Sequence, residues 1–301
     1  MPNIDLILKA IEFIESHLTE DISVADMAES VSFSLFHFSR IFSRSTRHTP
    51  YDYLMRRRLC EAAQCLMKSE EKIIDIAYRY KFKAPETFSR AFKRMFNLQP
   101  RQVRLERRLD QRQLMGKLAP EYLEFLNSGI SLKPEAKNLR PMQITGIAAP
   151  INANNPNLQI EEIWKLVGKE IQASGLKPAD RDYLGLRMFF TSNSTNQYIY
   201  FAGTSLVESE RAPHSFVQKS LPGLDYACFE LPEKPSAASF VRKYVYHSWW
   251  PKITNAPLAT FEIEFYSNRT AHKFEPQAVP VPQSLCFPLS FISFNNLGNE
   301  R

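Results

Sequence analysis

Through the first 110 residues, apolar side chains recur every three or four positions, which is the spacing that buries one face of a helix. Residues 4–18 show this spacing, and residues 51–67 show it over a longer stretch. After Pro141 the pattern changes to short runs of β-branched and aromatic residues, which are typical of strands. The pattern therefore predicts a helical first part and a strand-rich second part.

One helical pattern occurs twice, fifty residues apart. The run FSRIFSR at residues 38–44 returns as FSRAFKR at residues 88–94, and a proline stands six positions after each run. In each copy the phenylalanines share one helix face and the arginines share another. We expect the apolar face to dock and the basic face to point outward. A short helix and a tight turn with a buried phenylalanine precede each run, which predicts two helix-turn-helix units.

Signals for helix starts agree with this interpretation. Ser23 and Asp26 form a capping box, Ser34 is placed as an N-cap, and Thr49 with a following proline opens the long helix. That helix, residues 51–67, would be roughly 26 Å long. It would hold two recognition helices at a separation comparable to one turn of B-DNA, about 34 Å. Two tandem copies in one chain predict an asymmetric DNA site, whereas a symmetric dimer reads a palindrome.

The predicted boundaries are residues 1–112 for the helix-turn-helix domain, 113–140 for a helical linker and 141–301 for the second domain. Residues 101–112 carry five arginines and predict a basic helix, for which a solvated surface and a phosphate contact are equally good interpretations. The second domain is predicted to be an α+β fold on an antiparallel sheet. Its expected strands are residues 143–151, 183–190, 197–206, 226–231, 260–266 and 284–294, and its expected helices are residues 160–174 and 238–250.

Charge is distributed unevenly between the two parts. Residues 1–120 hold 21 Lys and Arg against 15 Asp and Glu, whereas residues 121–301 hold 17 of each, so the whole excess of +6 lies in the first part. A basic domain joined to a neutral one indicates a polyanion-binding module with a second function attached.

Composition argues against several kinds of site. Cys60, Cys65, Cys228 and Cys286 show no zinc-ligand spacing, so no metal and no cofactor are expected, and scattered thiols favour a reducing cytoplasm. Without a signal-peptide pattern or a membrane-length apolar run, we expect a cytoplasmic protein with no membrane partner. No Ser-His-Asp grouping or acid–base pair stands out, so we predict no catalytic residue and no enzymatic activity.

The two repeated runs, with Ala28 and Asp75-Ile76-Ala77 before them, closely resemble the AraC/XylS family of bacterial transcription regulators over about residues 5–110. Segments such as Ile144-Thr145-Gly146-Ile147 and the FEIEFY run at residues 261–266 resemble GyrI-like ligand-binding domains. The DNA-binding domain stands first, unlike in most of the family. The resemblance implies a multidomain protein, with an all-α double helix-turn-helix domain followed by an α+β GyrI-like domain on an antiparallel sheet.

The family resemblance also implies that early positions of the two outward helices meet base edges. Matched onto this chain, the base-contact residues are Phe36, Ser39, Arg40, Glu86, Thr87 and Arg90. Arginine can bind guanine O6 and N7 with two hydrogen bonds, glutamate can accept from the cytosine amino group, and phenylalanine can touch a thymine methyl. The family often has Trp at position 36 and Gln at position 86, so the preferred bases should differ.

Basic side chains around these positions are assigned to phosphates, which position the protein without specifying sequence. They are His37, Arg44, Lys81, Lys83, Lys93 and Arg94. For any single lysine, a solvated surface residue is an equally good interpretation.

The second domain is rich in aromatic residues, and Glu262 and Glu264 lie two apart on a predicted strand, hence on one face. A carboxylate in an aromatic pocket suits a lipophilic cation. The resemblance favours Glu264, through its spacing to Tyr266, over Glu262. The predicted ligand-binding residues are Glu264, Glu262, Tyr226, Tyr246, Trp249 and Trp164. Alternatively, both glutamates face solvent and the aromatic residues form the core.

These features together predict a nucleoid-associated activator that binds an asymmetric promoter site on double-stranded DNA as a monomer. RNA polymerase and a small, cationic lipophilic effector are the further partners that we expect. The alternatives for the second domain are a protein-interaction platform and a small-molecule hydrolase.

Overall fold

The computed structural model describes residues 4–153, 156–174, 182–190, 197–206, 211–253, 258–266 and 281–289. The chain forms two compact units. Unit 1 comprises Met1–Ser131 and Arg242–Pro257, and unit 2 comprises Leu132–Val241 and Leu258–Arg301. Unit 1 therefore includes a segment from the second half of the chain.

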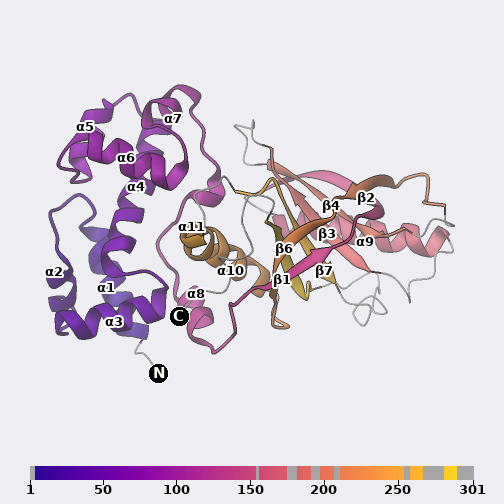
Figure 1. The fold of residues 1–301 in the computed structure, drawn as a ribbon, viewed down its shortest axis with the longest axis horizontal. Helices are drawn as coiled ribbons and strands as arrows, with labels where there is room; N and C mark the ends of the chain where they lie inside the picture. Colours follow the sequence, from indigo (N-terminus) through magenta and orange to yellow (C-terminus); the bar gives the residue numbers. More distant parts are fainter. Residues whose placement is uncertain are drawn as a thin grey trace. The chain divides into compact units, whose positions relative to one another are not determined.

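Unit 1 is helical (Figure 1). Helix α4 joins a first helix-turn-helix, made of α2 and α3, to a second, made of α5 and α6. The helices in chain order are α1 (Ile4–Ser16), α2 (Val24–Glu29), α3 (Leu35–Thr46), α4 (Pro50–Lys68), α5 (Ile73–Arg79), α6 (Pro85–Phe96), α7 (Pro100–Glu106), the 3-10 turn η1 (Gln111–Gln113) and α8 (Pro120–Asn127). Helix α4 has 19 residues and is therefore about 28 Å long.

The predicted helix starts are confirmed. The Ser23 hydroxyl and the Asp26 carboxylate form a reciprocal capping box at α2. The Ser34 hydroxyl accepts a hydrogen bond from the backbone N–H of His37, and the Thr49 hydroxyl caps α4 in the same way. Each cap satisfies a backbone donor that the first helical turn leaves unpaired.

The duplicated sequence folds twice in the same way. Ser32 and Lys81 occupy matching turn positions, both in the left-handed region with φ of 57° and 62°. The paired phenylalanines of α3 and α6 are fully buried, as predicted. Phe82 is buried in the second turn, whereas Phe33 in the first is only half-buried, so the expected buried phenylalanine is present in one turn of the two.

The predicted basic helix over residues 101–112 is wrong in its length. Helix α7 ends at Glu106 because Arg107 adopts the left-handed region, with φ of 52°. The Arg104 Nε donates to the Leu66 carbonyl at 2.8 Å, and Arg107 donates to the Met67 carbonyl at 3.1 Å. These arginines therefore satisfy carbonyls at the C-terminal end of α4, where positive charge is favourable.

The stretch expected to be a linker, residues 113–140, carries elements of both units. Helix α8 belongs to unit 1, where the guanidinium of Arg47 donates to the Leu126 carbonyl at 2.9 Å. Strand β1 (Glu135–Leu139) belongs to unit 2 and pairs with β6.

Residues from the second half of the chain complete unit 1. Helix α10 (Ala237–Tyr244) continues into a π-helical segment, η3 (Val245–Trp249), and then α11 (Trp250–Ile253). The Ser248 hydroxyl lies 3.0 Å from Nε2 of His48, and Nε2 of His247 donates to the Arg112 carbonyl at 3.0 Å. His48 is buried, and its Nδ1 lies 2.8 Å from Asp52 at the start of α4.

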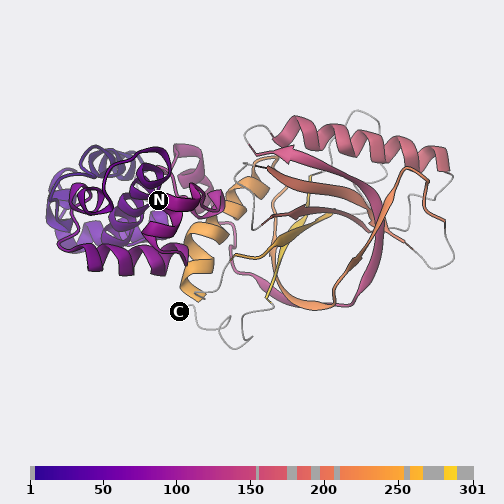
Figure 2. The same ribbon diagram turned by 90° about the horizontal axis from the view of Figure 1, so that it is seen from above.

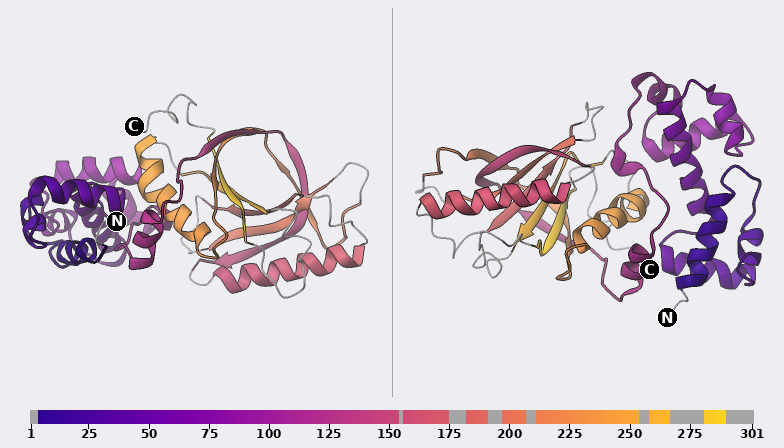
Figure 3. Two further views of the ribbon diagram at one scale, coloured as in Figure 1. Left: turned by 90° about the horizontal axis from the view of Figure 1, so that it is seen from below. Right: turned by 180° about the vertical axis from the view of Figure 1, so that it is seen from behind.

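Unit 2 is an eight-stranded antiparallel sheet that curls, with α9 (Pro156–Ser174) along one face (Figures 2 and 3). The strands are β1, β2 (Met142–Asn152), β3 (Tyr183–Met188), β4 (Gln197–Ser205), β5 (Val217–Leu221), β6 (Leu224–Glu230), β7 (Phe261–Tyr266) and β8 (Ser284–Pro288). Their order across the sheet is β1-β6-β8-β7-β3-β4-β2-β5.

The expected α+β class and antiparallel sheet are confirmed, but two strands were missed. The edge strands β1 and β5 have the sequences EAKNL and VQKSL, and most of their side chains are exposed or half-buried. Such polar edge strands carry little hydrophobic pattern. The strand predicted over residues 284–294 is observed as β8 up to Pro288, and residues 290–294 lie outside the described part of the chain.

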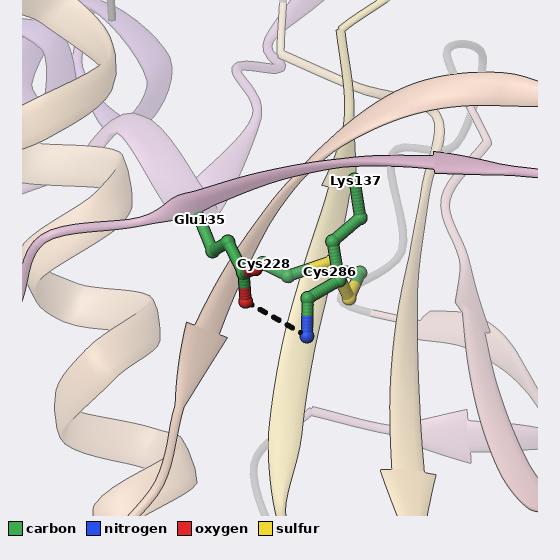
Figure 4. Close-up of a disulfide and its surroundings, with 4 residues drawn as sticks. All are labelled: Glu135, Lys137, Cys228 and Cys286. Carbon is green, nitrogen blue, oxygen red and sulfur yellow. Dashed lines mark ion pairs between the residues drawn. A yellow bond between two sulfur atoms is a disulfide. The ribbon is translucent and has the colours of Figure 1, made fainter. Parts of the chain in front are cut away.

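Two of the cysteines are bonded to each other, contrary to the expectation of four free thiols. Cys228 and Cys286 lie directly opposite each other in β6 and β8, and each is 1% exposed. Figure 4 shows the disulfide beside the Glu135–Lys137 ion pair of β1, whose charged atoms are 3.0 Å apart. Register explains the pairing, because sequence spacing alone cannot show which strands are neighbours.

Candidate nucleic-acid interface and effector site

The outer surface of α3 carries the side chains that the sequence assigned to DNA. Phe36 is 78% exposed, which is unusual for a large apolar side chain in a folded domain. Arg40 and Arg44 are exposed on the same helix, and Ser39 and His37 are half-buried. The opposite face is closed by Phe38 and Phe42, which pack on each other and on α4 through Tyr53.

Helix α6 and the turn before it present a matching surface. All the predicted contact residues of this second copy are exposed, namely Lys81, Lys83, Glu86, Thr87, Arg90, Lys93 and Arg94. Their helix docks through Phe88, Phe92 and Phe96, all of which are buried. The two helices therefore share both the buried aromatic face and the exposed arginine face that the repeat predicted.

Other arginines of unit 1 serve the fold. Arg57 on α4 is buried, and its Nε and Nη2 donate to the two carboxylate oxygens of Glu15 at 2.8 and 2.9 Å. Arg58 donates to the Leu18 carbonyl at 2.9 Å. Charge counting along the sequence cannot separate these structural arginines from the exposed ones, because both types contribute equally to the net charge.

In unit 2, Glu264 accepts hydrogen bonds from two tyrosines. The hydroxyls of Tyr200 and Tyr266 each donate to Glu264 Oε2 at 2.5 Å, and the indole N–H of Trp164 donates to the Tyr200 hydroxyl at 3.1 Å. Burial, reinforced by the Glu264 carboxylate, raises the pKa of both tyrosines well above the usual value. Both hydroxyls therefore keep their protons and remain donors.

Arg187 on β3 is the cation of this cluster. Its Nε lies 3.0 Å from Oε1 of Glu264 and 3.5 Å from Oε1 of Glu262. Burial opposes the charge on Arg187, but the Glu264 and Glu262 carboxylates and the tyrosines around it together outweigh burial and raise the pKa of the guanidinium. Glu262 is fully buried and Glu264 is 3% exposed, so the alternative that both glutamates face solvent is wrong.

Strand register explains how the cluster forms. In the pairing of β3 with β7, Arg187 stands opposite Glu262 and Gly185 stands opposite Glu264. A Cβ at Gly185 would lie 2.3 Å from the Tyr200 hydroxyl and 2.7 Å from Glu264 Oε2. Glycine therefore leaves the space in which the tyrosine meets the carboxylate.

Three of the six predicted ligand residues do not belong to this cluster. Tyr226 on β6 packs on the other face of the sheet, with Ile263 and Cys286, and its hydroxyl donates to the Pro222 carbonyl at 3.3 Å. Tyr246 and Trp249 lie in η3 and belong to unit 1. Aromatic content alone suggested them, and it carries no information on which face of a strand, or which unit, a residue occupies.

The structure adds three members that sequence reasoning did not assign, namely Arg187, Tyr200 and Tyr266. Each of the two tyrosines stands two positions from another polar or aromatic residue of its own strand. This spacing puts the two side chains on the same face of the strand, and it was the available sequence signal. No local signal marks Arg187, because its role depends on the pairing of β3 with β7, which are distant in the sequence.

The described residues contain neither a candidate metal site nor a candidate membrane span. No group of three or more His, Cys, Asp or Glu side chains among them is arranged to hold a metal ion. No helix in the described ranges combines the length and hydrophobicity that a bilayer span requires.

Comparisons with known proteins match both units. A family model described as a helix-turn-helix domain matches residues 27–106. A second, described as an integron-associated effector binding protein, matches residues 137–278. A solved structure, the integron cassette protein VCH_CASS2 from the mobile metagenome of Vibrio cholerae, is 15% identical with a TM-score of 0.36 and covers 51% of this chain and 94% of its own.

Two curated relatives match through unit 1. The uncharacterized HTH-type transcriptional regulator YbfP of Bacillus subtilis is 45% identical over 92 residues, which are 31% of each protein. The HTH-type transcriptional activator AarP of Providencia stuartii is 32% identical over 100 residues, which are 33% of this chain and 74% of AarP. The match therefore spans most of AarP but less than a third of YbfP. The chain belongs to the AraC-type family of helix-turn-helix transcription regulators, with a GyrI-like effector-binding domain after its DNA-binding domain.

Proposed function

We propose that unit 1 binds an asymmetric promoter site by inserting α3 and α6 into successive major-groove segments. The observation that carries this proposal is the repetition itself. Two helices with related sequences bury their phenylalanines and expose arginines at equivalent positions, Arg40 and Arg90. An α-helix fits the major groove, and an exposed arginine can read guanine there through two hydrogen bonds.

Base contacts are proposed for Phe36, Ser39 and Arg40 on α3 and for Glu86, Thr87 and Arg90 on α6. The proposed phosphate contacts surround them, at His37, Arg44, Lys81, Lys83, Lys93 and Arg94. The exposure of ten of these twelve side chains supports the assignment. Because the two copies differ in sequence, each helix should prefer its own bases, and the half-sites should not be identical.

Selection of genomic fragments followed by footprinting tests this proposal. We expect one protected region that covers about two turns of DNA, roughly 20 base pairs, in a directional sequence without dyad symmetry. Protein should bind with a stoichiometry of one chain per site. A palindromic footprint occupied by two chains would contradict the proposed arrangement.

An activating role and a contact with RNA polymerase are proposed by analogy with AarP, whose name describes a transcriptional activator. Transcription in vitro from a selected promoter, with purified RNA polymerase, measures both. We expect the full chain to raise transcript yield, and an Arg40→Ala/Arg90→Ala variant to lose this effect together with binding. A fall in transcript yield would assign the chain to repressors.

For unit 2 we propose that Glu264 and its tyrosines form the binding site for a small, cationic lipophilic effector. A carboxylate buried among aromatic rings offers a cation both charge and ring faces. Trp164, which donates to Tyr200 and lies 4.8 Å from the Tyr266 ring, extends the aromatic surface of this site.

A thermal-shift titration with tetraphenylphosphonium tests the effector proposal. We expect the melting temperature of the full chain to rise with the cation, and Glu264→Gln to abolish the rise. The matched control is Glu162→Gln, which changes an exposed glutamate on α9. If no cation shifts the wild-type chain, the protein-interaction platform becomes the better account of unit 2.

A further inference from the structure

The site proposed for a cationic effector already contains a cation from the chain itself. The guanidinium carbon of Arg187 lies 5.2 Å from the centre of the Tyr198 ring and 6.0 Å from that of Tyr200. The same group forms ion pairs with Glu264 and Glu262. A guanidinium held by carboxylates and ring faces makes the same kinds of contact that a lipophilic cation would make.

Among the three charged side chains of the cluster, Arg187 is more exposed than either glutamate. The Arg187 side chain is 15% exposed, whereas those of Glu262 and Glu264 are 0% and 3% exposed. Arg187 is therefore the least buried of the three charged side chains. A cation that approaches the carboxylates from solvent competes with Arg187 for them.

The position of Arg187 in the fold allows it to leave. Arg187 is the penultimate residue of β3, and its side chain is long and unbranched. A change of rotamer at a strand end can carry the guanidinium out to water while the backbone pairing with β4 and β7 is kept. Glu264, by contrast, is held at Oε2 by two tyrosine hydroxyls.

We propose that Arg187 is an intramolecular ligand of the site, which fills the cation position in the unliganded protein and is displaced by a cationic effector. This inference rests on the proposed function of unit 2. Both carboxyl groups pair with this one guanidinium, so an incoming cation competes with it at both of them.

Displacement also defines the class of effector. A ligand must offset the lost ion pairs of Arg187, and charge alone does not suffice, because it only replaces one cation by another. The remaining gain must come from aromatic and apolar area buried against the tyrosine rings. Bulky aromatic cations should therefore bind, whereas tetramethylammonium, with little apolar area, should not.

Removal of the competitor is the direct test. Isothermal titration of tetraphenylphosphonium into the full chain and into Arg187→Met gives the two dissociation constants. If Arg187 fills the site for about 90–99% of the time, the variant should bind about 10- to 100-fold more tightly. Arg211→Met, which changes an exposed arginine of the same unit, should leave the affinity unchanged.

The Arg187→Met variant removes the guanidinium that pairs with two buried carboxyl groups, which can prevent folding. Arg187→Met/Glu262→Gln removes one of them and keeps Glu264 with its two tyrosines. Thermal melting identifies which variant is folded, and the titration is made on that one. Ethylguanidinium, which carries the head group of arginine, is the second probe and is added to the same variant.

The outcomes separate this inference from the effector proposal. Tighter binding of tetraphenylphosphonium by the variant supports both. Equal affinity of wild type and variant, without an effect of ethylguanidinium, keeps effector binding but overturns the role of Arg187. A rise in the variant's melting temperature with ethylguanidinium, together with no binding of tetraphenylphosphonium, supports Arg187 as the resident cation and overturns the lipophilic effector.

Discussion

Arg40 and Arg90 occupy equivalent exposed positions on α3 and α6, so the same substitution at each tests the repeat as a functional unit. We expect Arg40→Ala and Arg90→Ala each to cost about 1–3 kcal/mol of binding free energy and to relax the base preference at one position of the site. Each variant should affect a different half of the site. Binding to a panel of single-base variants of the selected promoter site measures this.

Lys93→Ala is the matched control for these two variants, because Lys93 is exposed on the same helix as Arg90 and is assigned to a phosphate. Its loss should weaken binding to all sequences alike and should reduce the salt dependence of log K by about one phosphate contact. A uniform loss in Arg90→Ala, with a base-specific loss in Lys93→Ala, would reverse the assignment.

The substitution Gly185→Ala gives a second prediction for a single residue. A methyl group there would lie 2.3 Å from the Tyr200 hydroxyl and 2.7 Å from Glu264, so Gly185→Ala must separate the tyrosine from the carboxylate. We expect a loss of about 1–3 kcal/mol of unfolding free energy, as for other overpacked sites, and loss of cation binding. Urea denaturation and the tetraphenylphosphonium titration measure the two effects.

Gly116→Ala serves as the control for Gly185→Ala, because nothing lies within 4 Å of the added methyl group. It should change neither stability nor cation binding by a measurable amount. Unchanged cation binding in Gly185→Ala would show that the contact between Tyr200 and Glu264 is unnecessary for the effector.

Residue types and spacing predicted one site better than the other. The outward basic face and the buried phenylalanines follow from helical periodicity within each repeat, so the exposure of Arg40 and Arg90 could be predicted from the sequence. Glu264 was preferred through the resemblance to GyrI-like domains, which its spacing to Tyr266 matched. Arg187 could not be found in this way, because β3 and β7 are separated by more than seventy residues and only their register brings Arg187 to Glu262.

Among the elements, the disulfide between β6 and β8 has a clear expected effect on stability. It closes a loop with a sequence separation of 58 residues, and the loss of chain entropy in the unfolded state corresponds to about 4 kcal/mol. Both sulfurs are buried, so a reductant should act only when unit 2 opens. We expect the unfolding temperature of unit 2 to fall in repeated melts with reductant.

The variant Cys228→Ser/Cys286→Ser provides the control for the reductant experiment. It should melt at the lower temperature with or without reductant, whereas Cys65→Ser should behave like wild type. If the melting temperature of the wild type does not change with reductant after complete unfolding, the disulfide does not stabilise unit 2.

His247 in the π-helical segment η3 should make the stability of unit 1 depend on pH. Burial, together with the neighbouring His48, lowers the pKa of His247 to about 4, although its hydrogen bond to the Arg112 carbonyl opposes this. The unfolded chain takes up a proton near pH 6.5, whereas the folded chain resists it. Stability is therefore full above about pH 6.5 and falls as the pH decreases toward 4, by up to about 3 kcal/mol.

Urea denaturation of wild type and His247→Gln between pH 7 and 4.5 measures this contribution. Glutamine keeps a donor for the Arg112 carbonyl but does not titrate, so the variant should lose less stability over this range. His214→Gln, at an exposed histidine of unit 2, should follow the wild-type curve. Parallel curves for wild type and His247→Gln would show that His247 does not couple unfolding to protons.

Elements with strong local signals were predicted well. The caps at Ser23, Ser34 and Thr49 and the apolar periodicity of α1 and α4 are properties of a few neighbouring residues. The polar edge strands β1 and β5 lack such a signal, and α7 ends early where Arg107 turns into the left-handed region and, like Arg104, donates to a carbonyl of α4. Those contacts join segments nearly forty residues apart and are invisible to a local pattern.

At the scale of the whole molecule, the boundary of unit 1 differs from any continuous division of the sequence. Residues 242–253 belong to this unit through His247, Ser248 and the ring of Tyr246, over which the Arg112 guanidinium lies at 5.3 Å. Lys243 lies 5.9 Å from the centre of the Tyr122 ring of α8. The DNA-binding unit is thus completed by a segment that the sequence places within the second domain.

Because unit 1 includes residues 242–253, we predict that residues 1–131 alone do not form the complete folded unit. A fragment of residues 1–131 should unfold at a lower temperature than unit 1 does in the full chain, because His48 loses its contact with Ser248 and Tyr122 loses its contact with Lys243. A peptide of residues 237–257 added in trans should raise the melting temperature of the fragment by several degrees, since at 100 times its dissociation constant a ligand contributes about 2.7 kcal/mol. A scrambled peptide of the same composition should have no effect.

If fragment 1–131 instead melts like the full chain and its melting temperature does not change with the peptide, residues 242–253 do not stabilise the unit. If the peptide stabilises the fragment and also tightens its binding to promoter DNA, then the segment after α10 acts on the DNA-binding surface as well as on the fold.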